Sequence, residues 1–152
     1  MSDVRSMYEQ VILDHNKNPR NYGPMPDADR AVDGYNPLCG DTFKVYLKFD
    51  GDKIDGVSFE GNGCAISKSS ASLMTTLVKG KTREEAQELF EAFHQMLKSD
   101  PSEPVDDSHV GKLRVFSGIR EYPVRVKCAT LAWHALASAL QQDADSGSVT
   151  TE

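Results

Sequence analysis

The chain has three cysteines, and each lies in a setting where a thiol could do chemistry. Cys39 is followed by a glycine and an aspartate, Cys64 follows Gly61-Asn62-Gly63, and Cys128 follows a lysine. A thiolate is a nucleophile and a soft metal ligand, but an unpaired cysteine is also commonly a small buried hydrophobic residue. No CxxC pair is present, so for any one cysteine alone the packing role stays open.

A carboxylate extends the cysteine set to four possible ligands. Asp41 lies two residues after Cys39, so in an extended segment both side chains point to the same side. A strand pair joined by a tight turn brings its outer ends together, which predicts that Cys39, Asp41 and Cys64 lie close to one another. With Cys128 at the expected start of the last helix, three thiolates and one carboxylate fit tetrahedral zinc.

Local charges are expected to favour the thiolate form of these cysteines. A position at the N-terminus of a helix stabilises a negative charge, which applies to Cys64 and, in this interpretation, to Cys128. Arg125 and Lys127 lie close to Cys128 in the sequence and would favour the anion further.

The four histidines give a weaker signal for chemistry. His134 is six residues after Cys128 and is therefore expected on another helix face, His94 lies in an amphipathic helix, and His109 lies in a polar loop. His15 ends the first helix, where a cation suits the helix dipole. We expect surface or packing roles for all four.

The elements that must position the cysteines follow from periodicity. Apolar residues alternate from Phe43 to Phe49, an Asp50-Gly51 turn follows, and residues 54–60 can return antiparallel with a bulge at Asp55-Gly56. Residues 29–35 form a weaker strand candidate. The predicted helices cover residues 3–17, 65–79, 82–97 and 126–140, with a short helix or turn at 113–119.

Thr82 and Glu85 fit the capping box that begins a helix. This order of elements predicts an α+β fold in which a small antiparallel sheet of about three strands packs against several helices. Residues 1–141 are expected to form one domain and residues 142–152 a flexible tail.

Composition narrows the classes of partner. The 152 residues suit one domain, and 23 acidic against 17 basic residues give a net charge of −6, which argues against nucleic acid as the main partner. No apolar run is long enough to cross a bilayer, and the first ten residues lack the apolar stretch of a signal peptide. We therefore expect no membrane partner and a cytoplasmic location.

Three stretches carry a family resemblance: residues 36–41 (NPLCGD), 61–67 (GNGCAIS) and 126–133 (VKCATLAW). They resemble the three cysteine motifs of the IscU/SufU family, and the opening segment from Tyr8 to Gly23 is similar to the N-terminal segment of that family. The resemblance covers roughly residues 5–140, and three motifs in the same order are far more specific than one.

Two departures indicate the branch within this family. Lys127 occupies the position where the scaffold branch, IscU, has a histidine before the third cysteine, and residues 103–122 look like the insertion of the SufU branch. The resemblance therefore implies a zinc-dependent sulfurtransferase, which accepts persulfide sulfur from a SufS-type cysteine desulfurase and passes it to downstream Suf iron–sulfur assembly proteins.

The resemblance also implies roles for individual residues. Four residues would bind zinc. One of them, Cys39, would also be the sulfur acceptor, and it would be freed when a histidine of the desulfurase displaces it from zinc. Asp41 would tune the site and assist that exchange, and Arg125 is a candidate for orienting Asp41 or contacting the partner. The implied ligands are Cys39, Asp41, Cys64 and Cys128.

Two alternatives stay open at this stage. The first is a scaffold that assembles and transfers a [2Fe–2S] cluster, against which Lys127 weighs because lysine is a poor cluster ligand. The second is a structural zinc or adaptor protein whose cysteines do not exchange.

Overall fold

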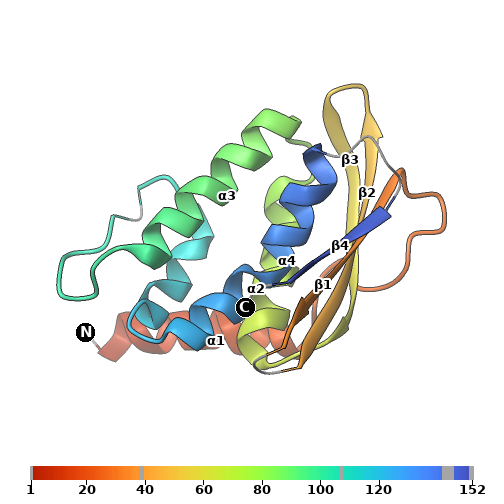
Figure 1. Cartoon of the computed structure of the whole chain (residues 1–152). Coiled ribbons are helices and arrows are strands. Elements are labelled where there is room, and N and C mark those ends of the chain that lie inside the picture. The colour runs from red at the N-terminus through yellow and green to blue at the C-terminus, as the bar shows by residue number, and fades with distance from the viewer. Residues whose placement is uncertain (1, 38–39, 107, 142–145, 151–152) are drawn as a thin grey trace.

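The computed structural model describes residues 2–37, 40–106, 108–141 and 146–150, with side chains described from residue 6 to residue 141 within those ranges. The order of elements begins with a helix, continues through three strands, and ends in helices and a short strand (Figure 1). The elements are α1 (Ser2–Lys17), β1 (Arg30–Asn36), β2 (Asp41–Asp50), β3 (Lys53–Asn62), α2 (Ala65–Val78), α3 (Arg83–Lys98), the 3₁₀ helix η1 (Gly111–Ile119), α4 (Pro123–Gln141) and β4 (Ser146–Thr150).

The first three strands form the antiparallel meander that the alternating pattern predicts. The strand order is β3-β2-β1-β4, and β1–β2 and β2–β3 pair antiparallel. The predicted bulge is present: Lys48 pairs with Gly56 and Phe49 with Ile54, which leaves Asp55 as the extra residue. The expected α+β fold is confirmed.

The C-terminal segment differs from the prediction of a flexible tail over residues 142–152. Residues 146–150 form β4, which pairs in parallel with β1 and gives the sheet a fourth strand. The sequence signal for this strand is weak because serine, glycine and threonine give it no apolar alternation. Backbone hydrogen bonds to the edge of β1 hold this strand in the sheet instead.

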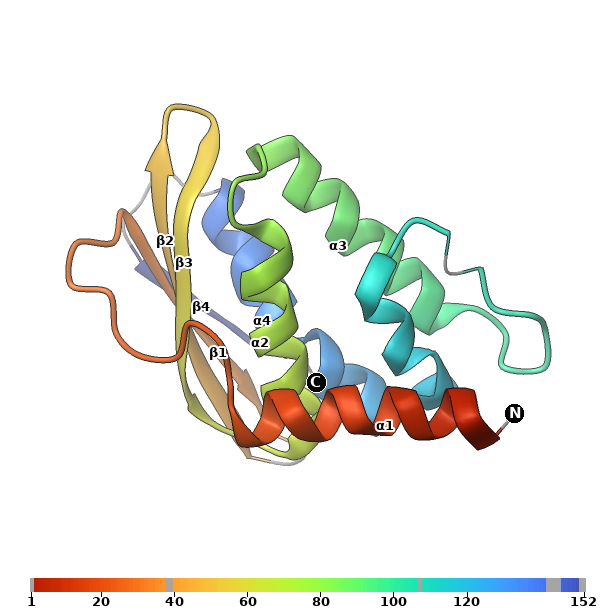
Figure 2. The ribbon, with the colours of Figure 1, turned by 180° about the vertical axis from the view of Figure 1, so that it is seen from behind.

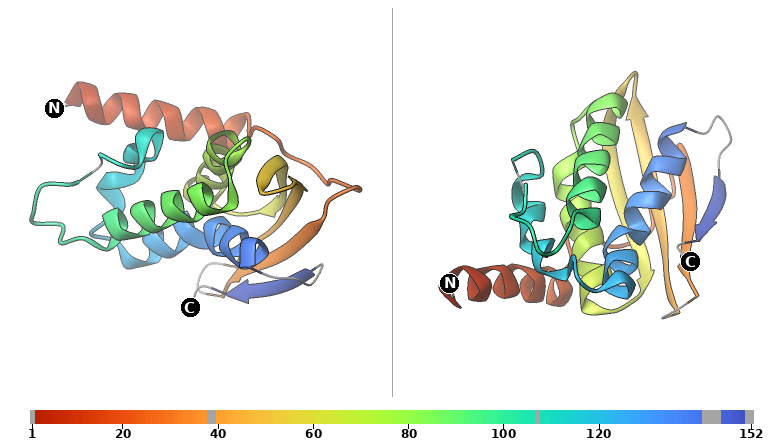
Figure 3. Two further views of the ribbon diagram at one scale, coloured as in Figure 1. Left: turned by 90° about the horizontal axis from the view of Figure 1, so that it is seen from above. Right: turned by 60° about the vertical axis from the view of Figure 1, so that its left-hand side comes forward.

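All of the helices lie on one side of the sheet. Figures 1 and 2 show α2 and α4 next to the sheet, with α3 beyond them and α1 crossing the N-terminal half of α2. The view from above in Figure 3 shows the same layers edge-on. Gly34 of β1 is buried and lies close to α4, since a Cβ added there would be 3.2 Å from Leu131 Cδ1.

The contact between α2 and α4 depends on small residues. Ser70 of α2 is fully buried, and its hydroxyl donates to the carbonyl oxygen of Ala129 at 2.6 Å and accepts from Trp133 Nε1 at 3.2 Å. Because serine adds little volume, the two helices approach closely while the indole N–H keeps a partner. This contact fixes α4 beside the first turns of α2.

Two helix boundaries affect the interpretation of the cysteines. The capping box at Thr82 and Glu85 is confirmed. The last helix, in contrast, begins at Pro123 and not near Val126, because proline is well tolerated in the first turn of a helix. Cys128 is therefore inside α4, and the prediction that it lies at a helix N-terminus is wrong. Within the described residues, no helix is long and apolar enough to span a membrane.

Candidate metal centre

Three of the four predicted ligands converge at one end of the sheet. Asp41 begins β2, Cys64 precedes α2, and Cys128 lies in α4, and their ligand atoms are all within 4.8 Å of one another. Asp41 and Cys128 are buried, whereas Cys64 is exposed. Within the part of the chain that the structure describes, this is the one group of three or more such residues close enough to share a metal ion.

The hairpin of β2 and β3 brings Asp41 and Cys64 together, as the sequence predicts. Thr42 pairs with Asn62, so the start of β2 lies beside the end of β3. The backbone N–H of Cys64 donates to Asp41 Oδ1 at 3.2 Å. This bond ties the carboxylate of one strand to the residue that begins the following helix.

Two glycines make the turn into α2 possible. Gly61 has a φ of +139°, and a Cβ there would be 2.1 Å from the carbonyl oxygen of Thr42. A Cβ on Gly63 would be 2.6 Å from Cζ of Phe43. The contact at Gly61 is with backbone atoms at a positive φ, so this position requires glycine, whereas a Cβ at Gly63 would require the side chains of Phe43 and Ser67 to shift. Tyr22 supports the same turn, since its hydroxyl donates to the carbonyl oxygen of Gly61 at 2.8 Å.

Cys64 is the N-cap residue of α2. Its sulfur accepts from the backbone N–H of Ser67 at 3.5 Å, and the Ser67 hydroxyl lies at the same distance. A hydrogen bond from Cys128 lowers the pKa of the Cys64 thiol to about 6; burial opposes this shift, and Ser67 adds to it. The predicted preference for thiolate at this helix N-terminus agrees with this direction.

Cys128 reaches the centre from within α4. It is 4% exposed and faces the sheet, where Nδ2 of the fully buried Asn36 lies 3.9 Å from its sulfur. The residue pattern alone predicts no role for Asn36. The only signal was its position at the start of the first cysteine motif, which says nothing of a contact with a residue 92 positions away.

One oxygen at this centre lacks a partner. Asp41 Oδ2 is buried and forms no hydrogen bond with any described residue, whereas Oδ1 accepts from Cys64. A buried carboxylate oxygen without a partner is costly, and a cation would supply the missing interaction. Two thiols and a carboxylate are also ligands that zinc prefers. The residues present therefore fit a metal ion.

Cys39, the fourth predicted ligand and the predicted sulfur acceptor, lies outside the described residues. The residues on either side are described: Asn36 and Asp41 are register partners, and the N–H of Gly40 donates to the carbonyl oxygen of Asn36 at 2.8 Å. Cys39 thus belongs to a short connection between β1 and β2, and Asp41 begins the strand that leaves it. Its role as a ligand stays a prediction.

The side chains of Arg125 and Lys127, the two basic residues near Cys128 in the sequence, lie against other parts of the protein. The guanidinium of Arg125 lies 4.8 Å from the ring centroid of Tyr122, and no ion pair joins it to Asp41 among the described residues. Lys127 lines a cleft between α3 and α4 together with His94 and His134. The structure thus gives no support for Arg125 as the residue that orients Asp41.

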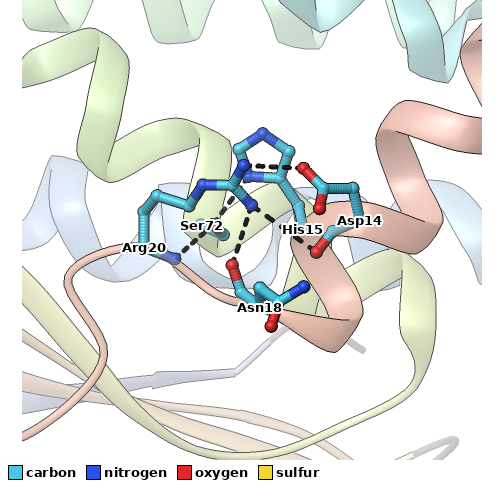
Figure 4. Close-up of polar contacts among 5 residues, drawn as sticks. All are labelled: Asp14, His15, Asn18, Arg20 and Ser72. Atoms are coloured by element: carbon cyan, nitrogen blue, oxygen red, sulfur yellow. Dashed lines mark hydrogen bonds and ion pairs between the residues drawn. The ribbon is translucent and has the colours of Figure 1, made fainter.

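In the described ranges, the group of Asp41, Cys64 and Cys128 includes no histidine. His15 is buried, and its Nδ1 lies 2.7 Å from the hydroxyl of Ser72, which also accepts from the N–H of Arg20 at 2.8 Å (Figure 4). Burial is the main cause that lowers the pKa of His15. The expected packing role of His15 is therefore confirmed. The expectation that His15 is a cation at the end of the helix is wrong, because a buried imidazole favours its neutral form.

Comparison with known proteins agrees with this geometry. The family model described as "NifU-like N terminal domain" matches residues 7–142. The chain belongs to this family. That match contains all four predicted ligands and extends from α1 to the end of α4.

Relatives within the family carry two kinds of name. The "Iron-sulfur cluster assembly scaffold protein IscU" of Streptococcus pyogenes serotype M1 is 38% identical over 100% of this chain and 94% of the relative. The "Zinc-dependent sulfurtransferase SufU" of Bacillus subtilis (strain 168) is 42% identical over 89% of this chain and 90% of the relative. The resemblance to the IscU/SufU family is therefore confirmed.

A solved structure extends the likeness to three dimensions. FiSufU from Fervidobacterium Islandicum AW-1 has a TM-score of 0.80 and 37% identity, over 87% of this chain and 95% of that one. The sheet and helices that position the cysteine centre are thus a shared fold. The two kinds of name among the relatives leave sulfur transfer and cluster assembly as the functions to be weighed.

Proposed function

We propose that this protein is a zinc-dependent sulfur carrier, a sulfurtransferase that accepts persulfide sulfur from a SufS-type cysteine desulfurase for iron–sulfur cluster assembly. The observation that carries the proposal is the centre of Asp41, Cys64 and Cys128, whose ligand atoms lie within 4.8 Å of one another and include a buried carboxylate oxygen that has no partner among the described residues. The named SufU relative at 42% identity gives it further support. Downstream Suf proteins would receive the sulfur.

Cys39 is the proposed fourth ligand and the sulfur acceptor. Bound zinc would keep the thiols deprotonated without changing its own oxidation state. Cys128 is buried and held beside Asn36 inside a helix, which suits a ligand that stays in place. Cys39, in contrast, is proposed as the ligand that exchanges, two residues before Asp41 in the sequence.

The proposed transfer is a thiolate–persulfide exchange. The Cys39 thiolate attacks the outer sulfur of the desulfurase persulfide, and a new S–S bond forms on Cys39 as the donor S–S bond breaks. The donor cysteine leaves as a thiolate with the electron pair, and the proton of the persulfide moves with the transferred sulfur. Atoms and charge balance, so no external oxidant or reductant is needed.

Asp41 is proposed to act through the metal and through Cys64. Its Oδ1 accepts from the Cys64 N–H, so Oδ2 is the oxygen free for zinc. A carboxylate oxygen is a harder ligand than a thiolate. With one oxygen and three sulfurs, zinc would be bound less tightly than by four thiolates, so an incoming ligand could replace Cys39 more easily. This assigns Asp41 a direct part in the site beyond charge balance.

A cluster-assembly scaffold is the second candidate. The IscU relative, 38% identical over the whole chain, favours it, and three cysteines with Asp41 could coordinate iron. Lys127 weighs against it, because it occupies the position before the third cysteine and lines the α3–α4 cleft. An ammonium group is a poor ligand for a cluster.

One experiment separates the candidates. The protein is purified under air and under anaerobic conditions, its zinc, iron and sulfide are measured, and the turnover of a SufS-type cysteine desulfurase is followed with and without it. We expect one zinc per chain, faster turnover, and a mass increase of one sulfur atom on the tryptic peptide that contains Cys39. The control variant is Asp50→Asn, which changes an exposed carboxylate at the far end of β2 and should behave like the unmodified protein.

The Cys39→Ala variant tests the acceptor. Loss of stimulation and of sulfur uptake, with Cys64 and Cys128 still present, would support the proposal. Stable iron and sulfide with a visible absorption spectrum would overturn it in favour of the scaffold. Zinc without any stimulation would leave a structural metal site.

A further inference from the structure

A cleft lies between α3 and α4, and none of the cysteines lines it. This cleft has a volume of about 570 Å³, within the range of small-molecule sites. It is lined by the last turn of α3, the loop that follows, and the outer face of α4. Its apolar lining residues are Leu97, Pro101, Pro123 and Val126, and the others are five basic side chains, the polar Ser99 and Thr130, and the acidic Asp100.

The charge in this cleft is opposite to that of the chain. Lys98, Arg120 and Lys127 line it, whereas Asp100 is its one carboxylate, in a protein of net charge −6. Neither Lys98 nor Lys127 lies within ion-pair distance of a carboxylate among the described residues. The Asp100 carboxylate accepts from the N–H of Ser102 at 2.9 Å and from its hydroxyl at 2.8 Å.

Arg120 holds the rim of the cleft in shape. Its Nη1 donates to the Ser99 hydroxyl at 2.9 Å and to the carbonyl oxygen of Asp100 at 3.1 Å, and its Nη2 donates to the carbonyl oxygen of Glu103 at 2.9 Å. All of these acceptors are neutral and tie the loop to Arg120, and the charge of the guanidinium also acts on the Asp100 carboxylate. The cleft is therefore built around a fixed positive group and two lysines.

Two histidines add protonation sites. The ring centroids of His94 and His134 are 5.5 Å apart, and each ring also packs on Phe90. Burial lowers the pKa of both histidines, and the charge of Lys98 lowers both further. The charged groups around the pair are Lys98, Asp100, Arg120 and Lys127, of which only one is acidic. Like charges gathered in this way repel one another unless an anion joins them.

We propose that the α3–α4 cleft binds a small organic dianion of the phosphate monoester class. The two lysines and the histidine pair bind the phosphate group, and the accessible apolar side chains of Pro101 and Val126 contact the organic part. Lysine suits a phosphate as a strongly charged donor on a flexible stem. Packing of the lysine stems alone accounts for their position but not for the convergence of five basic groups on one cavity.

Binding of phenyl phosphate to the full-length protein tests this proposal. Histidine imidazole resonances are followed by NMR at constant ionic strength and about pH 7.5, where phenyl phosphate is a dianion. We expect saturable shifts of the His94 and His134 resonances. Phenyl phosphate should bind about tenfold more tightly than inorganic phosphate, because the ring buries apolar surface that inorganic phosphate lacks.

Variants separate specific binding from general charge. Lys98→Gln should weaken phenyl phosphate binding about threefold to fivefold, whereas Lys112→Gln, on the exposed face of η1, should leave it unchanged. Bound anion should also raise the pH at which His94 and His134 titrate. Absence of saturable shifts, or equal losses in the two lysine variants, would overturn the site. Equal affinity for phenyl phosphate and inorganic phosphate would overturn the organic part of the proposal.

Discussion

Two polar clusters lie along α2, and they differ in whether their buried polar atoms have hydrogen-bond partners. At the start of the helix, Asp41, Cys64 and Cys128 gather around a carboxylate oxygen with no partner among the described residues. Farther along the helix, the Ser72 hydroxyl bonds to His15 and to the N–H of Arg20. Both clusters join segments far apart in the sequence, but only the second is complete with protein atoms alone.

This difference separates a binding site from a structural contact. A buried polar group without a partner costs free energy, so it persists where a ligand repays the cost or where function requires it. A satisfied cluster adds to stability without needing a ligand. In Figure 4, Asp14, His15, Asn18, Arg20 and Ser72 form one connected group that fastens α1 and the following turn to α2.

The largest expected effect concerns the unpaired oxygen. Asp41→Asn keeps an Oδ1 acceptor for the Cys64 N–H but replaces the proposed zinc oxygen with an amide. We expect zinc affinity to fall by more than about 100-fold, while the metal-free protein loses little stability. Competition with a chelator gives the affinity, and chemical denaturation gives the stability.

Asp50→Asn is the control for that variant and should bind zinc normally. A large loss of stability in the metal-free Asp41→Asn protein would contradict the contrast drawn above. In that case the carboxylate would be a structural group, like those around Ser72.

The next effect concerns the turn that places Cys64. Gly61→Ala brings a Cβ to 2.1 Å from the carbonyl oxygen of Thr42 at a φ of +139°, so the strand end must shift. We expect a loss of about 3 kcal/mol in the free energy of unfolding, together with weaker zinc binding. The control is Gly51→Ala, which has a positive φ but open space around the new Cβ, and it should cost about 1 kcal/mol. Equal costs would refute the steric argument.

The satisfied cluster should respond in stability alone. Ser72→Ala leaves His15 Nδ1 and the Arg20 N–H without their shared partner, which is expected to cost about 1–3 kcal/mol. Zinc content and affinity should stay unchanged. Thr76→Ala, which removes a hydroxyl bonded within its own exposed helix turn, is the matched control and should cost less. Loss of zinc from Ser72→Ala would show that the two clusters are coupled.

The smallest effect is the pH dependence of the same cluster. The pKa of His15 is lowered in the folded protein, so below about pH 6.5 the unfolded chain takes up a proton first. The free energy of unfolding should then fall as pH falls, by up to about 1.4 kcal/mol per pH unit until the folded protein is also protonated.

Denaturation curves at several pH values measure this slope. His15→Gln should reduce the slope, whereas His109→Gln, at an exposed loop position, should leave it unchanged. An unchanged slope in His15→Gln would mean that other groups, such as His94 and His134, control the acid sensitivity.

Local rules in the sequence predict much of the framework. The hairpin of β2 and β3, its bulge at Asp55, and the capping box at Thr82 each depend on residues within a few positions of one another. The convergence of Asp41 and Cys64 follows from that hairpin, since the ends of paired strands must meet. Start positions are harder to predict, and α4 begins three residues earlier than the apolar pattern suggests.

The sequence by itself determined the chemistry available to this protein: three thiols and a carboxylate in an α+β chain, with glycines that let one thiol approach the strand end. Only the tertiary structure decided which buried polar groups have hydrogen-bond partners. It placed Cys128 inside a helix beside Asn36, left Asp41 Oδ2 without a partner in the part of the chain that the structure describes, and buried His15 against Ser72. These contacts join segments that are distant in the chain, so they depend on how whole helices pack and not on any local pattern of residues.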